Sequence, residues 1–311
     1  MTKILVTGGA GFVGSNLVGA LLERGDEVRV LDNFSTGNRA NLVHAAGEVE
    51  VVEGDLRSYE RVHTAVRGVE LVYHQGALGS VPRSVQDPLT TTAVNVEGTL
   101  NVLLAARDEG VRRVVFASSS SVYGNGAGRP RSEDEAPDPI SPYGVAKLAA
   151  ERFCVSFHRV YGLETVALRY FNVFGPRQDP SSQYAAVVPR FIRAIAEGRE
   201  ITIHGDGEQS KDFTYVANVI DANLLAGDAP AAAGRVLNVA MGGSESVNAV
   251  AAAIGRLLDK EVLSVHGPDR PGDVRRSCAN VTAAREALGF EPRIGFEDGL
   301  RLTIESLLEE G

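Results

Sequence analysis

Short apolar runs alternate with longer amphipathic segments through the first half of the chain, and this alternation constrains the fold most. Buried parallel strands are continuous apolar runs of this length, and the segments between them repeat apolar residues at helical spacing. Parallel strands joined by helices with right-handed crossovers form a doubly wound sheet. The sequence therefore predicts an α/β fold with a parallel, Rossmann-type sheet. Its strands are expected at 3–7, 28–32, 49–53, 71–74, 113–118 and 165–170.

Three of the intervening helices have recognisable ends. They are expected at 12–24, 88–109 and 141–161. Gly25, Gly110 and Gly162 follow them directly, where a left-handed residue commonly ends a helix. The chain has 34 glycines and no low-complexity tract, so other glycines are expected in tight turns or where the backbone approaches a ligand.

After Tyr170 the alternation fades, and prolines and glycines interrupt the sequence. We expect a smaller lobe there, and a strand at 235–239 that returns with the preceding helix to the main sheet. The predicted division is a nucleotide-binding domain at 1–170 with a return segment at 214–241. A discontinuous C-terminal substrate lobe then comprises 171–213 and 242–311. The length of 311 residues suits this organisation.

Composition excludes several classes of function. The net charge is -9, from 31 basic and 40 acidic residues, which argues against nucleic acid or an anionic membrane surface as a partner. The two cysteines form no CxxC pair, and the six histidines include no HExxH motif, so we expect no metal site and no disulfide framework. Neither a signal peptide nor a membrane span is visible, and a cytoplasmic location is expected.

Gly8, Gly11 and Gly14 form a GxxGxxG motif between the first strand and the first helix. Glycines there allow a tight turn, close approach of a pyrophosphate and close packing of helix on sheet. The helix begins with Phe12 and Val13, where main-chain N–H groups and the positive end of the helix dipole favour an anion. An ordinary strand-to-helix turn is the alternative for the motif taken alone.

Asp32 ends the second strand, 18 residues beyond Gly14, where a carboxylate can accept hydrogen bonds from the adenosine ribose hydroxyls. A 2′-phosphate would meet like charge at this place, so the expected cofactor is NAD and not NADP. Asp55 follows the third strand and has two interpretations. It either contacts the adenine amino group or caps the next helix.

Tyr143 and Lys147 have YxxxK spacing within a predicted helix, so both side chains lie on one face. A nearby ammonium favours the phenolate and so suits the tyrosine to act as a base. Four serines, 118–121, follow a strand at the carboxyl edge of the sheet, where open α/β folds bind ligands. These features occur together after a GxxGxxG motif, and this joint occurrence is the strong signal.

Five segments together resemble the extended short-chain dehydrogenase/reductases of the NAD-dependent epimerase/dehydratase family, most of all the UDP-hexose 4-epimerases. They are 7–14, 32–37, 118–124, 143–147 and 169–176, and the resemblance spans nearly the whole chain. It implies Tyr143 as the base and Lys147 as the group that lowers its pKa and binds the nicotinamide ribose. Ser119 and Ser120 are implied as hydrogen-bonding groups at the reacting hydroxyl.

The resemblance also implies the two binding sites. The residues assigned to NAD are Gly8, Gly11, Phe12, Val13, Gly14, Asp32, Asn33, Ser35, Gly37, Asp55, Leu56, Gln75, Ala77, Asn95, Ser118, Tyr143, Lys147 and Tyr170. The residues assigned to a UDP-sugar are Ser80, Ser120, Tyr143, Asn172, Ala186, Val187, Lys211, Arg270, Asp273 and Ser277. Relatives generally have arginine at Lys211, and lysine lacks the bidentate fork.

Ser119, Ser120 and Ser121 occupy places where dehydratases of the family carry Thr-Asp-Glu, so no carboxylate is available to eliminate water. We therefore favour a 4-epimerase. The loop 79–84 and the small Ser277 resemble epimerases that accept N-acetylhexosamines, which points to UDP-GlcNAc/UDP-GalNAc, with UDP-Glc/UDP-Gal as further substrates. A UDP-glucuronate 4-epimerase, a 4-keto sugar reductase and a non-catalytic NAD-binding protein are the alternatives. The resemblance also implies a homodimer through the helices at 88–109 and 141–161.

Overall fold

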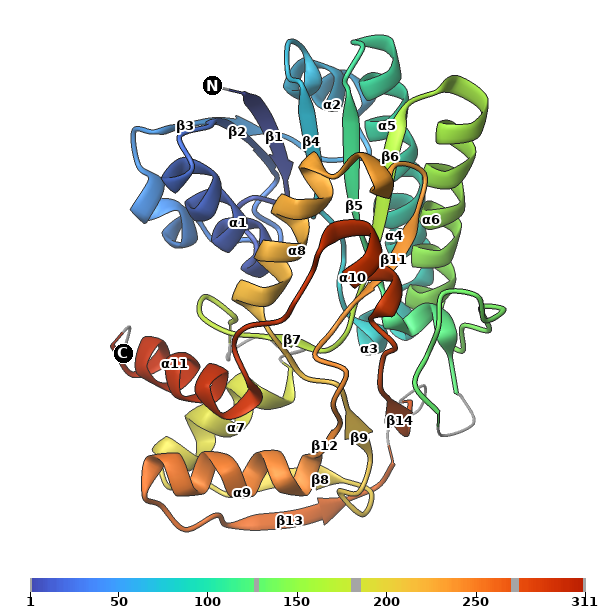
Figure 1. Cartoon of the computed structure of the whole chain (residues 1–311). Coiled ribbons are helices and arrows are strands. Elements are labelled where there is room, and N and C mark those ends of the chain that lie inside the picture. Colours follow the sequence, from blue (N-terminus) through green and yellow to red (C-terminus); the bar gives the residue numbers. More distant parts are fainter. Residues whose placement is uncertain (1, 126–128, 180–185, 270–273, 310–311) are drawn as a thin grey trace.

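A seven-stranded parallel sheet forms the larger part of the molecule (Figure 1). The computed structural model describes residues 2–125, 129–179, 186–269 and 274–309. The strands lie in the order β11-β6-β5-β4-β1-β2-β3. Their bounds are β1 Lys3–Thr7, β2 Glu27–Asp32, β3 Val49–Glu53, β4 Leu71–His74, β5 Arg113–Ser119, β6 Glu164–Tyr170 and β11 Val236–Val239. The predicted Rossmann-type sheet is confirmed, as is the return of the later strand beside β6.

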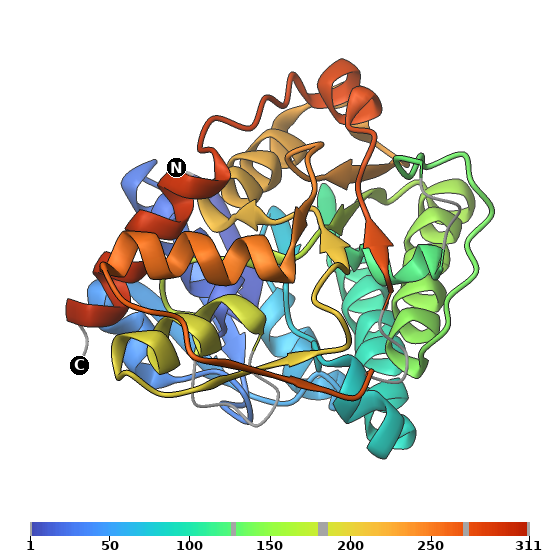
Figure 2. The same ribbon diagram turned by 90° about the horizontal axis from the view of Figure 1, so that it is seen from below.

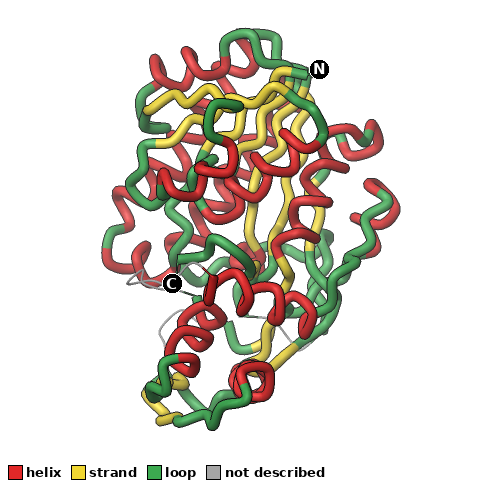
Figure 3. The backbone as a smooth tube through the Cα atoms, turned by 90° about the vertical axis from the view of Figure 1, so that its left-hand side faces the viewer, coloured by secondary structure: helices red, strands yellow, loops and turns green. Residues whose placement is uncertain are grey.

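Helices cover both faces of this sheet (Figure 3). One face carries α1 (Phe12–Glu23) and α8 (Val216–Asp228), and the other carries α2 (Tyr59–Val66), α5 (Gly98–Asp108) and α6 (Pro142–Tyr161). The packing of strand β1 explains the uninterrupted apolar run in its sequence. Ile4 and Val6 belong to the core cluster on the first face, and Leu5 between them belongs to the cluster on the second. A strand buried on both sides needs apolar residues at every position.

The predicted helix ends are confirmed at glycines with left-handed backbone. Gly25, Gly110 and Gly162 have φ of 86°, 70° and 72°. Helix α6 also begins as its sequence suggests, because the Ser141 hydroxyl accepts a hydrogen bond from the Gly144 N–H at 3.1 Å and Pro142 occupies the first turn.

The helix expected at 88–109 is confirmed as one continuous helical segment over 88–108, although it is not α-helical throughout. It consists of α4 (Pro88–Thr92), a π-helical turn at Ala93–Glu97, and α5. The π turn contains Asn95, whose amide contacts both main-chain groups of Leu78, at 2.8 Å to its N–H and 3.1 Å to its carbonyl. Such turns insert one residue into a helix and often occur at functional sites.

The remaining strands and helices lie mostly beyond the carboxyl ends of the sheet strands (Figures 1 and 2). Residues Val173–Phe174 (β7) pair with Thr214–Tyr215 (β10), and β12, β9 and β14 form a small three-stranded sheet. The bounds are α7 Val187–Ala196, β8 Ile201–His204, β9 Ser210–Lys211, β12 Glu245–Ser246, α9 Val247–Leu258, β13 Ser264–Gly267, β14 Arg276–Ser277, α10 Thr282–Leu288 and α11 Phe296–Glu309. The division into domains stays a prediction. No described helix is both long and apolar enough to cross a bilayer.

Candidate functional site

The glycine turn brings β1, α1 and the loop after β4 into close contact. Gly8 has φ of 68°, and a Cβ there would lie 2.6 Å from Cα of Gly76. A Cβ at Gly14 would lie 2.1 Å from the carbonyl oxygen of Gly8. Gly11 is the N-cap of α1 and provides no side-chain cap, so Phe12 and Val13 begin a helix whose positive end is open to an anion. These features fit a dinucleotide pyrophosphate.

Replacement of Gly14 by alanine should abolish NAD retention and lower the melting temperature, because the new methyl group would overlap the Gly8 carbonyl. The matched control is Gly19→Ala in the same helix, where the nearest atom to a Cβ is Nε2 of His44 at 3.2 Å, at the end of a flexible side chain. NAD content of the purified variants and thermal unfolding measure both effects. A Gly14→Ala protein that keeps NAD like the control would contradict this assignment.

Asp32 lies beside the glycine turn at the end of β2 and is nearly buried. Its Oδ2 accepts a hydrogen bond from the Ala10 N–H at 2.9 Å, and Oδ1 accepts one from the Phe34 N–H at 2.8 Å. A Cβ at Gly37 would lie 3.0 Å from the same carboxylate. The turn and the 33–37 loop therefore hold this carboxylate where a ribose is expected.

Asp55 does not cap a helix. The N-cap of α2 is Ser58, whose hydroxyl accepts a hydrogen bond from the Arg61 N–H, so that alternative is wrong. The Asp55 carboxylate instead accepts hydrogen bonds from the Arg57 guanidinium at 2.7 and 2.9 Å and from the Asn33 amide at 2.9 Å. These bonds, that from Arg57 above all, lower the pKa of Asp55 to about 2. Its adenine contact stays a prediction.

Several other cofactor candidates line the ends of β4 and β6. Tyr170 donates a hydrogen bond from its hydroxyl toward Oε1 of Gln75 at 3.1 Å and Oδ1 of Asn223 at 2.9 Å, and Gln75 also donates to Asn223 at 3.0 Å. Sequence reasoning missed Asn223, which α8 contributes. Of the rest, Leu56 is buried, Ala77 is half-buried, and Ser35 donates its N–H to Oδ1 of Asn33 at 3.1 Å.

Tyr143 and Lys147 both point from α6 toward the carboxyl end of β5. Burial raises the pKa of Tyr143 above its ordinary value, and the Ser119 hydroxyl beside the phenol lowers this pKa by a smaller amount. The buried Lys147 donates from Nζ to the carbonyl oxygen of Ala117 at 2.7 Å, and burial lowers its pKa to about 8. That Lys147 lowers the pKa of Tyr143 stays a prediction. Ser84, which sequence reasoning missed, accepts the Tyr143 N–H at 3.0 Å.

The four serines diverge in direction. Ser119 ends β5, and its hydroxyl accepts the Ser121 N–H at 3.2 Å, while half-buried Ser120 begins a 3₁₀ turn at Ser120–Tyr123. Ser118 is buried and donates its hydroxyl to Oε2 of Glu151 at 2.9 Å, so its side chain faces α6.

Glu151 and Arg169 form a buried ion pair beneath these serines that sequence reasoning missed. Nε and Nη2 of Arg169 donate to the two carboxylate oxygens at 2.8 and 2.7 Å, and neither side chain is more than 1% exposed. The spacing held a signal, because Glu151 follows Lys147 by four residues and so lies on the same face of α6.

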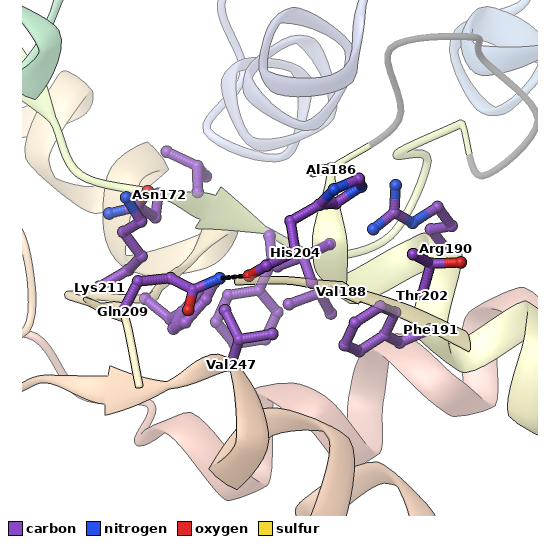
Figure 4. A pocket seen from close by; sticks show the side chains of 14 residues that line it. Asn172, Ala186, Val188, Arg190, Phe191, Thr202, His204, Gln209, Lys211 and Val247 are labelled. Atoms are coloured by element: carbon purple, nitrogen blue, oxygen red, sulfur yellow. Dashed lines mark hydrogen bonds between the residues drawn. The ribbon is translucent and has the colours of Figure 1, made fainter. Parts of the chain in front are cut away.

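A pocket of about 230 Å³ lies among β7, α7, β8, β9 and the start of α9, in the region predicted to form the smaller lobe (Figure 4). It brings together four predicted substrate residues, Asn172, Ala186, Val187 and Lys211. Other lining residues, which the sequence did not indicate, include Arg190, Thr202, His204 and Gln209. Figure 4 shows Asn172 and Lys211 at one end of the pocket and Arg190 and Thr202 at the other, and Gln209 donates its amide to the carbonyl of His204 at 2.8 Å.

The other predicted substrate residues lie apart from this pocket's lining. Ser80 caps the short helix α3 (Val81–Gln86) by accepting the Arg83 N–H at 3.2 Å. Ser277 is buried in β14, paired in register with Lys211. Arg270 and Asp273 lie outside the described residues.

The family model for the NAD-dependent epimerase/dehydratases matches residues 4–240. The chain belongs to this family. It is 39% identical over 311 residues to a UDP-glucose 4-epimerase of Mycolicibacterium smegmatis, covering 97% of both chains. It is 31% identical over 315 residues to a UDP-glucuronate 4-epimerase of Thermodesulfobacterium geofontis, covering 98% of this chain and 95% of the relative.

One solved structure with a similar fold is the UDP-N-acetylglucosamine 4-epimerase of Methanobrevibacter ruminantium in complex with UDP-N-acetylmuramic acid. It is 38% identical, has a TM-score of 0.95, and the match covers 100% of this chain and 99% of that one. Membership of the family confirms the extended short-chain dehydrogenase/reductase fold and NAD as cofactor. Across the described ranges, no group of three His, Cys, Asp or Glu side chains is placed to hold a metal ion.

Proposed function

We propose that this enzyme inverts C4′ of a UDP-hexose through a 4-keto intermediate. The observation that carries the proposal is that the Tyr143 phenol faces the Ser119 hydroxyl at the carboxyl edge of β5, in the same sheet whose strand β1 leads into the glycine turn. Ser119, Ser120 and Ser121 leave no carboxylate at this edge to drive elimination of water. Oxidation followed by reduction at the same carbon is then the simplest chemistry.

In this proposal Tyr143 accepts the proton of the sugar 4′-hydroxyl, and Ser119 and Ser120 orient that hydroxyl by hydrogen bonds. NAD, when bound, supplies the capacity to accept hydride from C4′ and to return it. Gly8, Gly11 and Gly14 hold its pyrophosphate, Asp32 its adenosine ribose and Lys147 its nicotinamide ribose. The 4-keto sugar rotates within the site and presents its opposite face, so that the hydroxyl is restored with the opposite configuration.

The uridine diphosphate is assigned to the pocket of the smaller lobe. Ala186 and Val187 offer apolar contacts for uracil and ribose, while Asn172 and Lys211 offer donors for the diphosphate. Lys211 already donates to the carbonyl oxygen of Val274. A point charge can still attract phosphate at this position, but it cannot form the bidentate contact of an arginine. Arg270 and Asp273 remain sequence-based assignments for the diphosphate and the ribose.

The preferred sugar is assigned as N-acetylglucosamine or N-acetylgalactosamine. Ser277 has the small side chain that leaves space beside C2′, and the M. ruminantium relative named above is a UDP-N-acetylglucosamine 4-epimerase. The T. geofontis relative, a UDP-glucuronate 4-epimerase, favours a second candidate substrate, UDP-glucuronate.

Incubation with UDP-Glc, UDP-GlcNAc and UDP-GlcA separately, without added cofactor, tests the proposal. The purified enzyme is expected to convert UDP-GlcNAc to UDP-GalNAc with no net consumption of reductant, and to convert UDP-Glc to UDP-Gal. Chromatographic separation of the products measures each reaction. Turnover that requires added reductant would indicate a reductase, and turnover of UDP-GlcA alone would make the second candidate correct.

The proposed enzyme is a cytoplasmic homodimer, and both properties stay predictions. The assigned interface joins α4 and α5 with α6. Exposed apolar side chains support it, since Leu89 on α4 and Val145 and Val160 on α6 are all more than half exposed in the single chain.

A further inference from the structure

Asp212 is a fully buried acid that the proposed chemistry does not use. It lies between Lys211 and Phe213, both of which line the lobe pocket. Burial raises the pKa of Asp212 to about 6, while hydrogen bonds from three main-chain N–H groups lower it. Burying a carboxylate costs free energy unless hydrogen bonds compensate for the lost water. The groups that donate to Asp212 therefore indicate what it stabilises.

The carboxylate of Asp212 joins segments that are distant in the sequence. Its Oδ1 accepts the Met241 N–H at 3.0 Å, and its Oδ2 accepts the N–H groups of Gly242 at 3.0 Å and Ala279 at 3.2 Å. The main-chain carbonyl of Asp212 also accepts a hydrogen bond from the Asn172 amide at 3.3 Å.

These partners mark the places where the chain passes between the main sheet and the smaller lobe. Asn172 follows β6, Asp212 precedes β10, and Met241 and Gly242 follow β11. Ala279 adds the segment that follows β14. The Asp212 carboxylate therefore ties its own crossing to the one at Met241 and Gly242 and to the segment after β14, and the Asp212 main-chain carbonyl ties it to the crossing at Asn172.

Asn172 itself depends on this arrangement. Its φ of 31° lies in the left-handed region, which few residues other than glycine adopt without support. Besides the bond to Asp212, its carbonyl accepts the Thr214 N–H at 3.3 Å. Asp212 thus bonds Asn172 through its main-chain carbonyl and directly follows Lys211 in the chain. Both neighbours are polar residues of the pocket.

We infer that Asp212 is a positioning residue. Its carboxylate fixes the 211–213 segment against Met241, Gly242 and Ala279, and so places Lys211, and Asn172 through the Asp212 main-chain carbonyl, in the arrangement that binds the diphosphate side of a UDP-sugar. The inference rests on the proposed function. An asparagine cannot replace the carboxylate, because its amide nitrogen would face an N–H group where an acceptor is needed.

Asp212→Asn is expected to weaken UDP binding and to raise KM for the UDP-sugar by about tenfold or more, since bonds to a charged acceptor are lost. Its kcat should stay within about threefold and its NAD content should not change, because Tyr143, Lys147 and the glycine turn lie on other elements. Calorimetry with UDP alone, steady-state kinetics and the amount of NAD bound after purification measure these quantities.

Asp212→Glu keeps the charge and should bind UDP with intermediate affinity. Asp298→Asn, which removes an exposed carboxylate paired with Arg301, is the matched control and should match the wild type. Wild-type UDP affinity and KM in Asp212→Asn would overturn the inference, as would an equal loss of NAD. If Asp212→Asn does not fold, wild-type UDP affinity in Asp212→Glu would overturn it. Failure of the wild type to convert any UDP-sugar would instead refute the proposed function.

Discussion

Tyr143→Phe is expected to lower kcat by about 10²- to 10⁴-fold, the range that a positioned acid-base group contributes. The substitution removes only the hydroxyl that faces Ser119. The ring and the Tyr143 N–H, which Ser84 accepts at 3.0 Å, remain in place. Binding of NAD should therefore persist, since its proposed ligands other than Tyr143 are unchanged. Initial rates with UDP-GlcNAc and the NAD released on denaturation measure the two effects.

Tyr161→Phe provides the control for this substitution. Tyr161 lies at the other end of the same helix, is 52% exposed, and stacks against the guanidinium of Arg107. Its replacement should leave turnover unchanged. If Tyr143→Phe kept near-normal activity, Tyr143 could not be the base. If it lost NAD together with activity, the loss would reflect binding and not proton transfer.

Local sequence patterns predicted the sheet because strands buried on both faces are apolar throughout, and helix ends are marked by glycine. The π turn inside the helix at 88–109 was not predictable from the sequence, for a physical reason. Its π turn is stabilised by the contacts of Asn95 with Leu78, which lie in the tertiary structure and leave no mark in helical periodicity.

The site was predictable where motif spacing fixes geometry, as for Tyr143 and Lys147 on one face of α6. Residues whose importance comes from long-range contacts were missed. Asp212 reaches Met241 and Ala279, and Asn223 reaches Gln75, through pairings that only the folded chain creates. Ser118 was assigned to the cofactor, but its hydroxyl faces Glu151.

The Glu151–Arg169 pair connects the helix that carries Tyr143 with β6, and the hydrogen bond from Ser118 adds the strand that leads into the serines. Glu151 lies on α6, Arg169 on β6, and Ser118 on β5 donates to the same carboxylate. Within the described parts of the chain, Nη1 of Arg169 has no hydrogen-bond partner, and the guanidinium lies 4.6 Å from the centre of the Tyr123 ring. Arg169 therefore depends on Glu151 for both of its charge-assisted bonds.

Glu151→Ala is expected to lower the free energy of unfolding by about 3–5 kcal/mol, because it leaves the Arg169 charge buried without its partner. The midpoint of urea unfolding in the presence of saturating NAD measures the change. The control is Glu197→Ala, which breaks an exposed ion pair with Arg193 and Arg199 and should not shift the midpoint.

A double replacement separates loss of the pair from loss of packing. Glu151→Leu combined with Arg169→Met removes both charges and fills similar volume, so it should recover much of the stability lost in Glu151→Ala. It cannot restore the bond to Ser118, and turnover should therefore stay below that of the wild type even where stability is recovered. A double variant no more stable than Glu151→Ala would show that packing around Glu151, and not the unpaired Arg169 charge, causes the loss.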